Sequence, residues 1–163
     1  MATTSGTAKV TLPADNQIQI TREFDAPRHL VWRTVTEPEL IKRWWAGDRG
    51  TVRSVDVDLR VGGTWRYVMD AAPGFEVAFH GEYREIEAPE RLVNTEAFEG
   101  IPDADAHAAL CTLTLSEKDG RTYLEVLVEH VDQADRDAHI NSGMEGGMQE
   151  SYDKLEQVAT TLT

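Results

Sequence analysis

Cysteine is almost absent from this chain of 163 residues, since Cys111 is the only one. A single cysteine excludes an intrachain disulfide and a CxxC metal or redox site. Long apolar runs are absent too, so no segment is expected to span a bilayer. The first ten residues lack the basic-then-apolar pattern of a signal peptide, and we therefore expect a cytoplasmic protein. Cys111 itself lies in an alternating apolar stretch, so we interpret it as a small core residue.

Positive charge is also scarce. The chain has 16 Lys and Arg residues against 29 Asp and Glu residues, which gives a formal net charge of -13. Nucleic-acid binding depends on basic side chains that neutralise phosphates, and binding to anionic membranes depends on the same charges. We therefore expect neither nucleic acid nor membrane insertion among the partners of this protein.

The common catalytic and cofactor motifs are missing. The sequence contains no G-x-S-x-G elbow, no P-loop and no dinucleotide-binding fingerprint. Its histidines do not recur at the spacings of metal ligands, such as HxxxH or HxH. We expect no metal, no cofactor and no assigned catalytic residue. His130 still stands out, because it ends an apolar strand face and could point inward.

What the chain does contain is a long run of strand-like alternation. Apolar and polar residues alternate over 17–24, 51–59, 64–69, 77–86, 92–98, 110–116 and 122–130, which predicts six to seven antiparallel strands. Lys118-Asp119-Gly120 predicts a hairpin turn. Across that hairpin, Cys111, Leu113 and Leu115 should face the same side as Leu124, Val126 and Val128. Residues 1–15 are small and polar, so we expect a flexible or edge-associated segment before a single domain over 16–163.

Two short helices are expected after the first strand. Asp25-Ala26-Pro27 resembles a helix start with Asp25 as the N-cap, and Pro38 is expected to open a second helix. Trp44 and Trp45 would end that second helix. One of the two should pack into the core, and the other either covers it partly or roofs the mouth of a cavity.

The C-terminal stretch is amphipathic and predicts a long helix. Ile140, Met144, Met148 and Tyr152 recur every four residues, and the same stripe continues to Leu162. Glycines at 143, 146 and 147 leave two interpretations of its first half. Either the helix begins near Met148 and the glycines form a loop, or it begins near Asp135 and the glycines leave space for a cavity beside the methionines.

Several stretches together resemble a known family. These are ITREFDAPRHLVWRTVTEPELIKRWW (20–45), VDLRVGG (57–63), TWRY (64–67), FHGEYREIEAPERLVNTEAFEG (79–100) and SGMEGGMQESYDKL (142–155). In this order they are similar to the bacterial homologues of the activator of the 90-kilodalton heat-shock chaperone ATPase. That family belongs to the START-like, or SRPBCC, superfamily. The resemblance implies an α+β helix-grip fold, in which a curved antiparallel sheet wraps around the C-terminal helix and encloses a hydrophobic cavity.

From this fold we expect a small hydrophobic or amphipathic ligand in the cavity. The expected lining residues are Trp44, Trp45, Trp65, Tyr67, Met69, Phe79, His130, Met144, Met148 and Tyr152. Two other functions stay open. One is a cyclase- or aromatase-like enzyme, which would need polar groups converging inside the cavity. The other is a chaperone-linked interaction module, which would need a large apolar patch on the outer face of the sheet. A homodimer is also compatible with the sequence.

Overall fold

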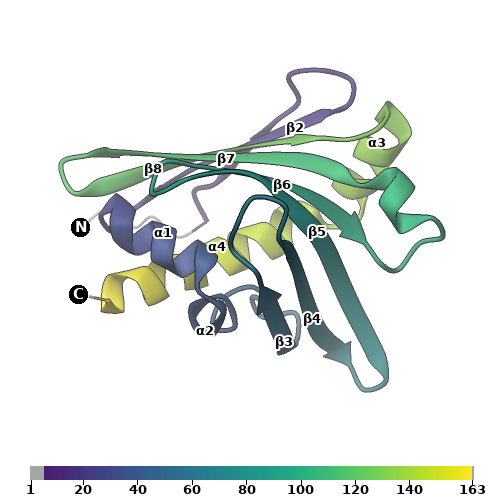
Figure 1. Ribbon diagram of the computed structural model, residues 1–163, viewed down its shortest axis with the longest axis horizontal. Helices are drawn as coiled ribbons and strands as arrows, with labels where there is room; N and C mark the ends of the chain where they lie inside the picture. The colour runs from purple at the N-terminus through teal and green to yellow at the C-terminus, as the bar shows by residue number, and fades with distance from the viewer. Residues whose placement is uncertain (1–5, 163) are drawn as a thin grey trace.

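The computed structural model describes residues 6–162 as one curved sheet with the long C-terminal helix on its concave side (Figure 1). Eight strands pair in the order β1-β2-β8-β7-β6-β5-β4-β3, and every neighbouring pair is antiparallel. The strands are β1 (Lys9–Thr11), β2 (Gln17–Phe24), β3 (Thr51–Val57), β4 (Thr64–Ala72), β5 (Phe75–Glu87), β6 (Arg91–Phe98), β7 (Ala109–Lys118) and β8 (Arg121–Glu129). The helices are α1 (Arg28–Thr36), α2 (Pro38–Ile41), the 3-10 helix η1 (Ala104–His107), α3 (Gln133–Asn141) and α4 (Met144–Thr161).

The predicted α+β helix-grip layout is confirmed, with one strand more than the six to seven expected. The additional strand is β1, a three-residue edge strand that pairs with β2. It was missed because three residues are too few for an alternation signal. The inward register of the β7–β8 hairpin is as predicted: Cys111 pairs with Val128, Leu113 with Val126 and Leu115 with Leu124.

The start of α1 differs from the prediction. Its N-cap is Pro27 in an extended conformation, not Asp25. Other contacts hold the backbone before the helix: Thr122 Oγ1 donates a hydrogen bond to the Ala26 carbonyl at 2.7 Å, and Asp25 N donates to Glu156 at 2.8 Å. The Asp25 carboxylate accepts a hydrogen bond from Arg121 instead of capping the helix. Pro38 opens α2 as predicted, but α2 ends at Ile41, so the two tryptophans that follow lie in turns.

The C-terminal stretch forms two helices, so the prediction of one continuous helix from Asp135 is wrong. The break falls at Ser142 and Gly143, and Gly143 has φ +83°, a conformation that favours glycine. The alternative start near Met148 is wrong as well, since α4 begins at Met144.

The glycines of α4 accommodate Arg49 rather than an internal space. A Cβ on Gly146 would lie 2.9 Å from Arg49 Nη2, and one on Gly147 would lie 3.9 Å from Arg49 Cζ. Glu150, one turn further along α4, accepts from Arg49 Nε at 3.4 Å with either carboxylate oxygen. The hypothesis that these glycines leave room for a cavity is therefore wrong, because their open side faces the loop before β3.

Arg22 joins the helix layer to the sheet. It occupies an inward position on β2 between Ile20 and Phe24, and its side chain is 0% exposed. Arg22 Nη1 donates to Asp153 at 2.7 Å and Nη2 donates to Glu156 at 3.3 Å, both on α4. The guanidinium also lies 5.1 Å from the Phe24 ring centroid. One buried cation thus fixes the position of α4 along β2.

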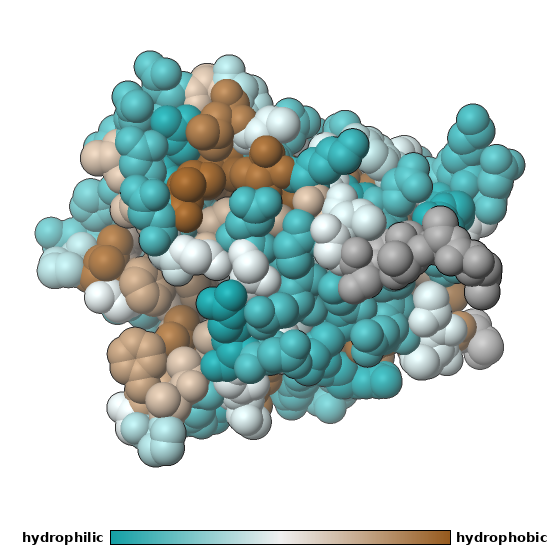
Figure 2. Space-filling view, turned by 180° about the vertical axis from the view of Figure 1, so that it is seen from behind, coloured by the Kyte–Doolittle hydropathy of each residue, from teal (hydrophilic) through white to brown (hydrophobic). Residues whose placement is uncertain are grey.

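Exposed hydrophobic residues are visible on the rear face of the molecule. Figure 2 shows the rear face as mostly hydrophilic, with hydrophobic groups in its upper part and at the lower left. The lower-left group coincides with the turn between β4 and β5, where Phe75 is 60% exposed. Within residues 6–162, no helix is both long and apolar enough to cross a bilayer.

Replacing Arg22 should destabilise the fold strongly. Arg22→Met leaves Asp153 and Glu156 without their buried cation, and losing one partner of a buried ion pair costs about 3 kcal/mol. Urea denaturation at neutral pH measures this loss. Arg121→Met is the matched control, because its ion pairs lie at the surface and should contribute less than about 1 kcal/mol. Equal stabilities for the two variants would contradict the role given to Arg22.

Candidate functional site

A row of aromatic side chains runs along the concave side of β4, β5 and β6. Trp65 and Tyr67 have ring centroids 4.6 Å apart, and Tyr67 is 5.4 Å from Trp45. Trp45 is also 5.7 Å from Phe79, which lies 5.2 Å from Phe98. The row begins at buried Trp65 and ends at Phe98, which is 40% exposed. It therefore leads from the core to the surface.

The two adjacent tryptophans have different environments. Trp44 Nε1 donates to the Thr34 carbonyl of α1 at 2.8 Å, and its ring packs 6.5 Å from Tyr152. Trp45 lies edge-on to Tyr67 and Phe79, across from the strands. Trp44 thus ties the turn to α1, whereas half-buried Trp45 covers the aromatic row from the helix side.

Helix α4 packs its apolar side chains against the core on the concave side of the sheet. Met144, Met148 and Tyr152 are half-buried and pack against the core cluster, as their four-residue spacing predicts. The Tyr152 ring is edge-on to Phe24 at 5.9 Å. Methionine side chains, which adapt their shape, therefore form part of the apolar lining that α4 presents to the core.

Met69 and His130 lie apart from this row. Met69 is half-buried between Val52 and Val77, and it is not among the side chains that pack against the core cluster. His130 Nε2 lies 3.0 Å from Nδ1 of His139 on α3. Burial lowers the pKa of both imidazoles, that of His139 to about 4, so both are neutral at pH 7. His130 Nδ1 is buried and has no hydrogen-bond partner within the described residues.

Polar side chains that the sequence analysis did not single out also lie on the concave side. Glu96 Oε2 lies 3.7 Å from the Cys111 thiol, and Tyr67 and Tyr152 interact electrostatically with the Glu96 carboxyl. Burial raises the pKa of Glu96 and of Cys111, and it raises that of neighbouring Tyr83 to about 12. The available signal was alternation on β6, which gives Glu96 the inward phase of Leu92 and Asn94.

A second polar cluster lies on the outer face of the sheet. Arg66 donates two hydrogen bonds of 2.9 Å to Glu99, and His80 Nδ1 lies 2.8 Å from the same carboxylate. His80 Nε2 contacts Asp105 of η1. Hydrogen bonding from Arg66 and then from His80 lowers the pKa of Glu99 to about 2. The hydrogen bonds to Asp105 and Glu99 raise the pKa of His80.

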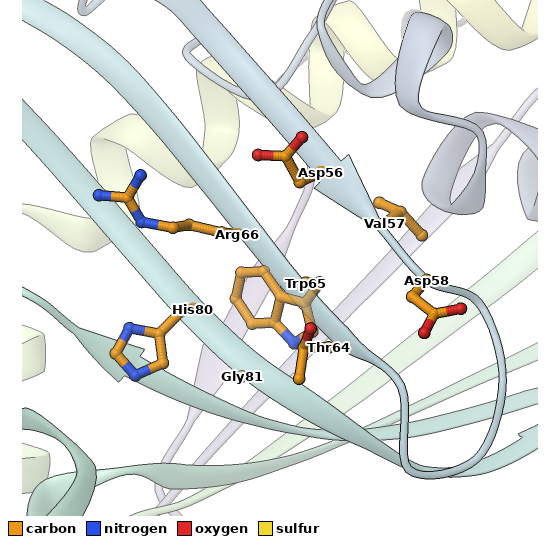
Figure 3. Close-up of a pocket in the computed structure, with 8 residues that line it drawn as sticks. All are labelled: Asp56, Val57, Asp58, Thr64, Trp65, Arg66, His80 and Gly81. Carbon is orange, nitrogen blue, oxygen red and sulfur yellow. The ribbon is translucent and has the colours of Figure 1, made fainter.

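The surface beside this cluster is a shallow open depression of about 410 Å3. Figure 3 shows Asp56, Arg66 and His80 extending from three neighbouring strands. Arg66 pairs with Glu99, His80 contacts Glu99 and Asp105, and Asp56 is exposed. Within residues 6–162, no group of three or more His, Cys, Asp or Glu side chains could hold a metal ion. We interpret this cluster as the link between η1 and the sheet.

A curved, open antiparallel sheet wrapped around a C-terminal helix defines a START-like protein. More specifically, the chain belongs to the family described as "Activator of Hsp90 ATPase homolog 1-like protein", whose model matches residues 25–160.

Solved bacterial structures share this fold over nearly their whole length. A Rhodobacter sphaeroides protein has a TM-score of 0.87 at 24% identity, with 95% of this chain and 99% of that chain covered. A Nitrosomonas europaea protein has a TM-score of 0.80 at 25% identity, with 92% and 97% covered. A Mycobacterium smegmatis protein has a TM-score of 0.80 at 23% identity, with 95% and 96% covered. No curated protein matches the chain.

The position of the Trp65 indole depends on a glycine beneath it. A Cβ on Gly81 would lie 1.8 Å from the Thr95 carbonyl oxygen and 2.6 Å from Trp65 Nε1, which donates to that same carbonyl. Gly81→Ala should therefore destabilise the protein by at least ~2 kcal/mol and shift the tryptophan fluorescence. Gly62→Ala, with φ +83° and nothing within 4 Å of the added Cβ, should cost only about 1 kcal/mol. Similar costs for both variants would contradict this account of Trp65.

The outer cluster should make stability dependent on acid. A carboxyl with a folded pKa near 2 stabilises the fold above its ordinary value of 4.5, and this contribution is lost as the pH falls from 4.5 towards 2. The Arg66→Met variant should have a lower free energy of unfolding than the native protein at pH 7. This difference should shrink as the pH falls from 4.5 towards 2. Urea titrations at several pH values test this. Arg60→Met, which removes an exposed pair with Asp58, is the control and should cost less than about 1 kcal/mol at pH 7. A pH-independent difference for Arg66→Met would contradict the assignment.

Proposed function

We propose that this protein binds a small hydrophobic or amphipathic molecule between the aromatic row and α4. The observation that carries the proposal is the row itself, in which Trp45, Tyr67 and Phe79 keep accessible surface although they lie on the concave side of the sheet. Large apolar side chains in such a position normally become fully buried, because each square ångström removed from water contributes about 25 cal/mol. An apolar ligand would complete that burial.

The arrangement of the row also supports an entry route. Phe98 is exposed at one end, and Trp45 covers the centre from a turn rather than from a regular helix. A turn is easier to displace than a helix, because fewer backbone hydrogen bonds hold it. A flat ligand would enter along Phe98 and Phe79 and displace Trp45.

An enzyme acting in the same space is the second candidate. A cyclase- or aromatase-like reaction needs polar groups inside an apolar site, and Glu96, Tyr67 and Tyr152 provide such groups. Analysis of the released molecule distinguishes the two functions, because an enzyme releases a changed product, whereas a carrier or sensor returns the ligand unaltered. A chaperone-linked role has less support, because the outer face near β4 and β5 carries ion pairs instead of a large apolar patch.

The first experiment is native mass spectrometry of the protein purified from its own host, followed by a thermal-shift screen of lipids and aromatic compounds. A co-purifying molecule, or a midpoint that rises with ligand concentration as mass action requires, supports the proposal. An empty protein that no compound stabilises would contradict it.

Trp45 offers a specific mutational test. Trp45→Ala should weaken binding of the uncharged fluorescent probe N-phenyl-1-naphthylamine about tenfold or more, because the loss of a large apolar contact costs about 1.5–3 kcal/mol. Fluorescence titration measures the affinity. Tyr123→Ala is the control, since Tyr123 is an aromatic residue on β8 that is 40% exposed and outside the row. Equal affinity for both variants would contradict the location of the site.

A further inference from the structure

We propose that Glu96 is a specificity-determining residue, which selects ligands that carry an uncharged hydroxyl group and rejects ligands that carry a carboxylate. The inference rests on the proposed function and concerns which molecules the same site accepts. The two oxygens of the Glu96 carboxyl have different environments.

One oxygen of Glu96 is occupied and the other is free. Oε2 accepts a hydrogen bond from the Cys111 thiol at 3.7 Å. Oε1 has no hydrogen-bond partner within residues 6–162, and it is not among the buried unpartnered atoms, so it keeps accessible surface. No Lys, Arg or His of the described residues forms an ion pair with this carboxyl. Glu96 therefore has an open acceptor position and no cation that would attract an anionic ligand.

The hydroxyl of Tyr152 is in the same condition. It makes no hydrogen bond within the described part of the chain. It is also not among the buried unpartnered atoms, so it keeps accessible surface. It belongs to α4, across from the sheet, and it interacts electrostatically with Glu96 and Cys111. A free acceptor on β6 and a free donor on α4 thus share one region of the concave side.

A hydroxyl group fits this pair better than other common polar groups. Its O–H can donate to Glu96 Oε1 while its oxygen accepts from the Tyr152 hydroxyl, so both protein atoms gain a partner. A carboxylate would place a second negative group beside Glu96 without a cation to offset either charge. An ether would accept from Tyr152 but leave Glu96 unpaired.

The placement relative to the aromatic row defines the rest of the ligand. Tyr67 belongs to the row and also interacts with Glu96, so the row and the polar pair meet at this residue. A ligand that stacks against Trp45 and Phe79 would reach Glu96 with its polar end. The class is therefore an aromatic or similarly flat apolar molecule with a hydroxyl group at one end.

Three probes with one ring system test the selection. They are 2-naphthol, which donates a hydrogen bond, 2-methoxynaphthalene, which only accepts, and 2-naphthoate, which is an anion. Isothermal titration of the native protein at pH 7 should find 2-naphthol about five- to tenfold tighter than the ether, the value of one hydrogen bond. 2-Naphthol should also bind more than tenfold tighter than 2-naphthoate.

Two substitutions separate the hydrogen bond from the charge. Glu96→Met should abolish the advantage of 2-naphthol over 2-methoxynaphthalene. Glu96→Gln keeps an acceptor oxygen but removes the negative charge, so it should keep much of that advantage and bind 2-naphthoate better than the native protein does. Glu125→Gln, on the outer face of β8 opposite Thr21 and Thr114, is the matched control and should change neither ratio. Thermal melts establish that each variant is folded.

The outcomes separate this inference from the function beneath it. If none of the three probes binds the native protein, the proposed site itself is contradicted. If all three bind with affinities that fall in Trp45→Ala but do not change in either Glu96 variant, the site stands and the role of Glu96 is overturned. The role of Glu96 is also overturned if 2-naphthoate binds most tightly of the three probes.

Discussion

The whole arrangement depends on a buried cation between the sheet and the C-terminal helix. Arg22 points inward from β2, and its charge is neutralised by Asp153 and Glu156 on α4. A buried charge is tolerated only when its partners are held in place, so this contact fixes both the position and the rotation of α4. The rotation in turn directs Met148 and Tyr152 towards the sheet. The polar contact thus specifies one helix position, while the surrounding apolar side chains provide most of the burial.

The concave side of the sheet is covered by different kinds of element along its width. The core is closed where β2, β7 and β8 face the second half of α4, around Leu124, Leu155 and Ala159. Towards β4 and β5 the sheet curves away, and the covering element changes from a helix to the turn that carries Trp45. The aromatic row lies against this turn, where Trp45, Tyr67 and Phe79 are only half-buried. The fully buried core and the proposed binding region therefore lie in different parts of one continuous interior.

The charge distribution agrees with this division. Arg66, His80 and Glu99 satisfy one another on the outer face, so their strong electrostatic interactions connect η1 to the sheet and need no ligand. Glu96 lies on β6 and faces the other side of the sheet, and within residues 6–162 the Cys111 thiol is its only hydrogen-bond partner. A carboxyl without a cation inside an apolar region is costly for folding alone. That cost becomes understandable if a ligand regularly completes the hydrogen bonding.

Much of the fold followed from the sequence by itself. Alternation predicted the strands and the inward faces of β7 and β8. The four-residue spacing predicted the inward face of α4, and Pro38 predicted the start of α2. All of these are local signals of backbone geometry. The tertiary structure alone decided four other matters. It broke the C-terminal stretch at Gly143, it turned the glycines of α4 towards Arg49, and it separated Trp44 from Trp45. It also brought Glu96, Cys111 and Tyr152 together from β6, β7 and α4. Such contacts depend on how a curved sheet and a helix meet, and no short-range pattern along the chain encodes that distance.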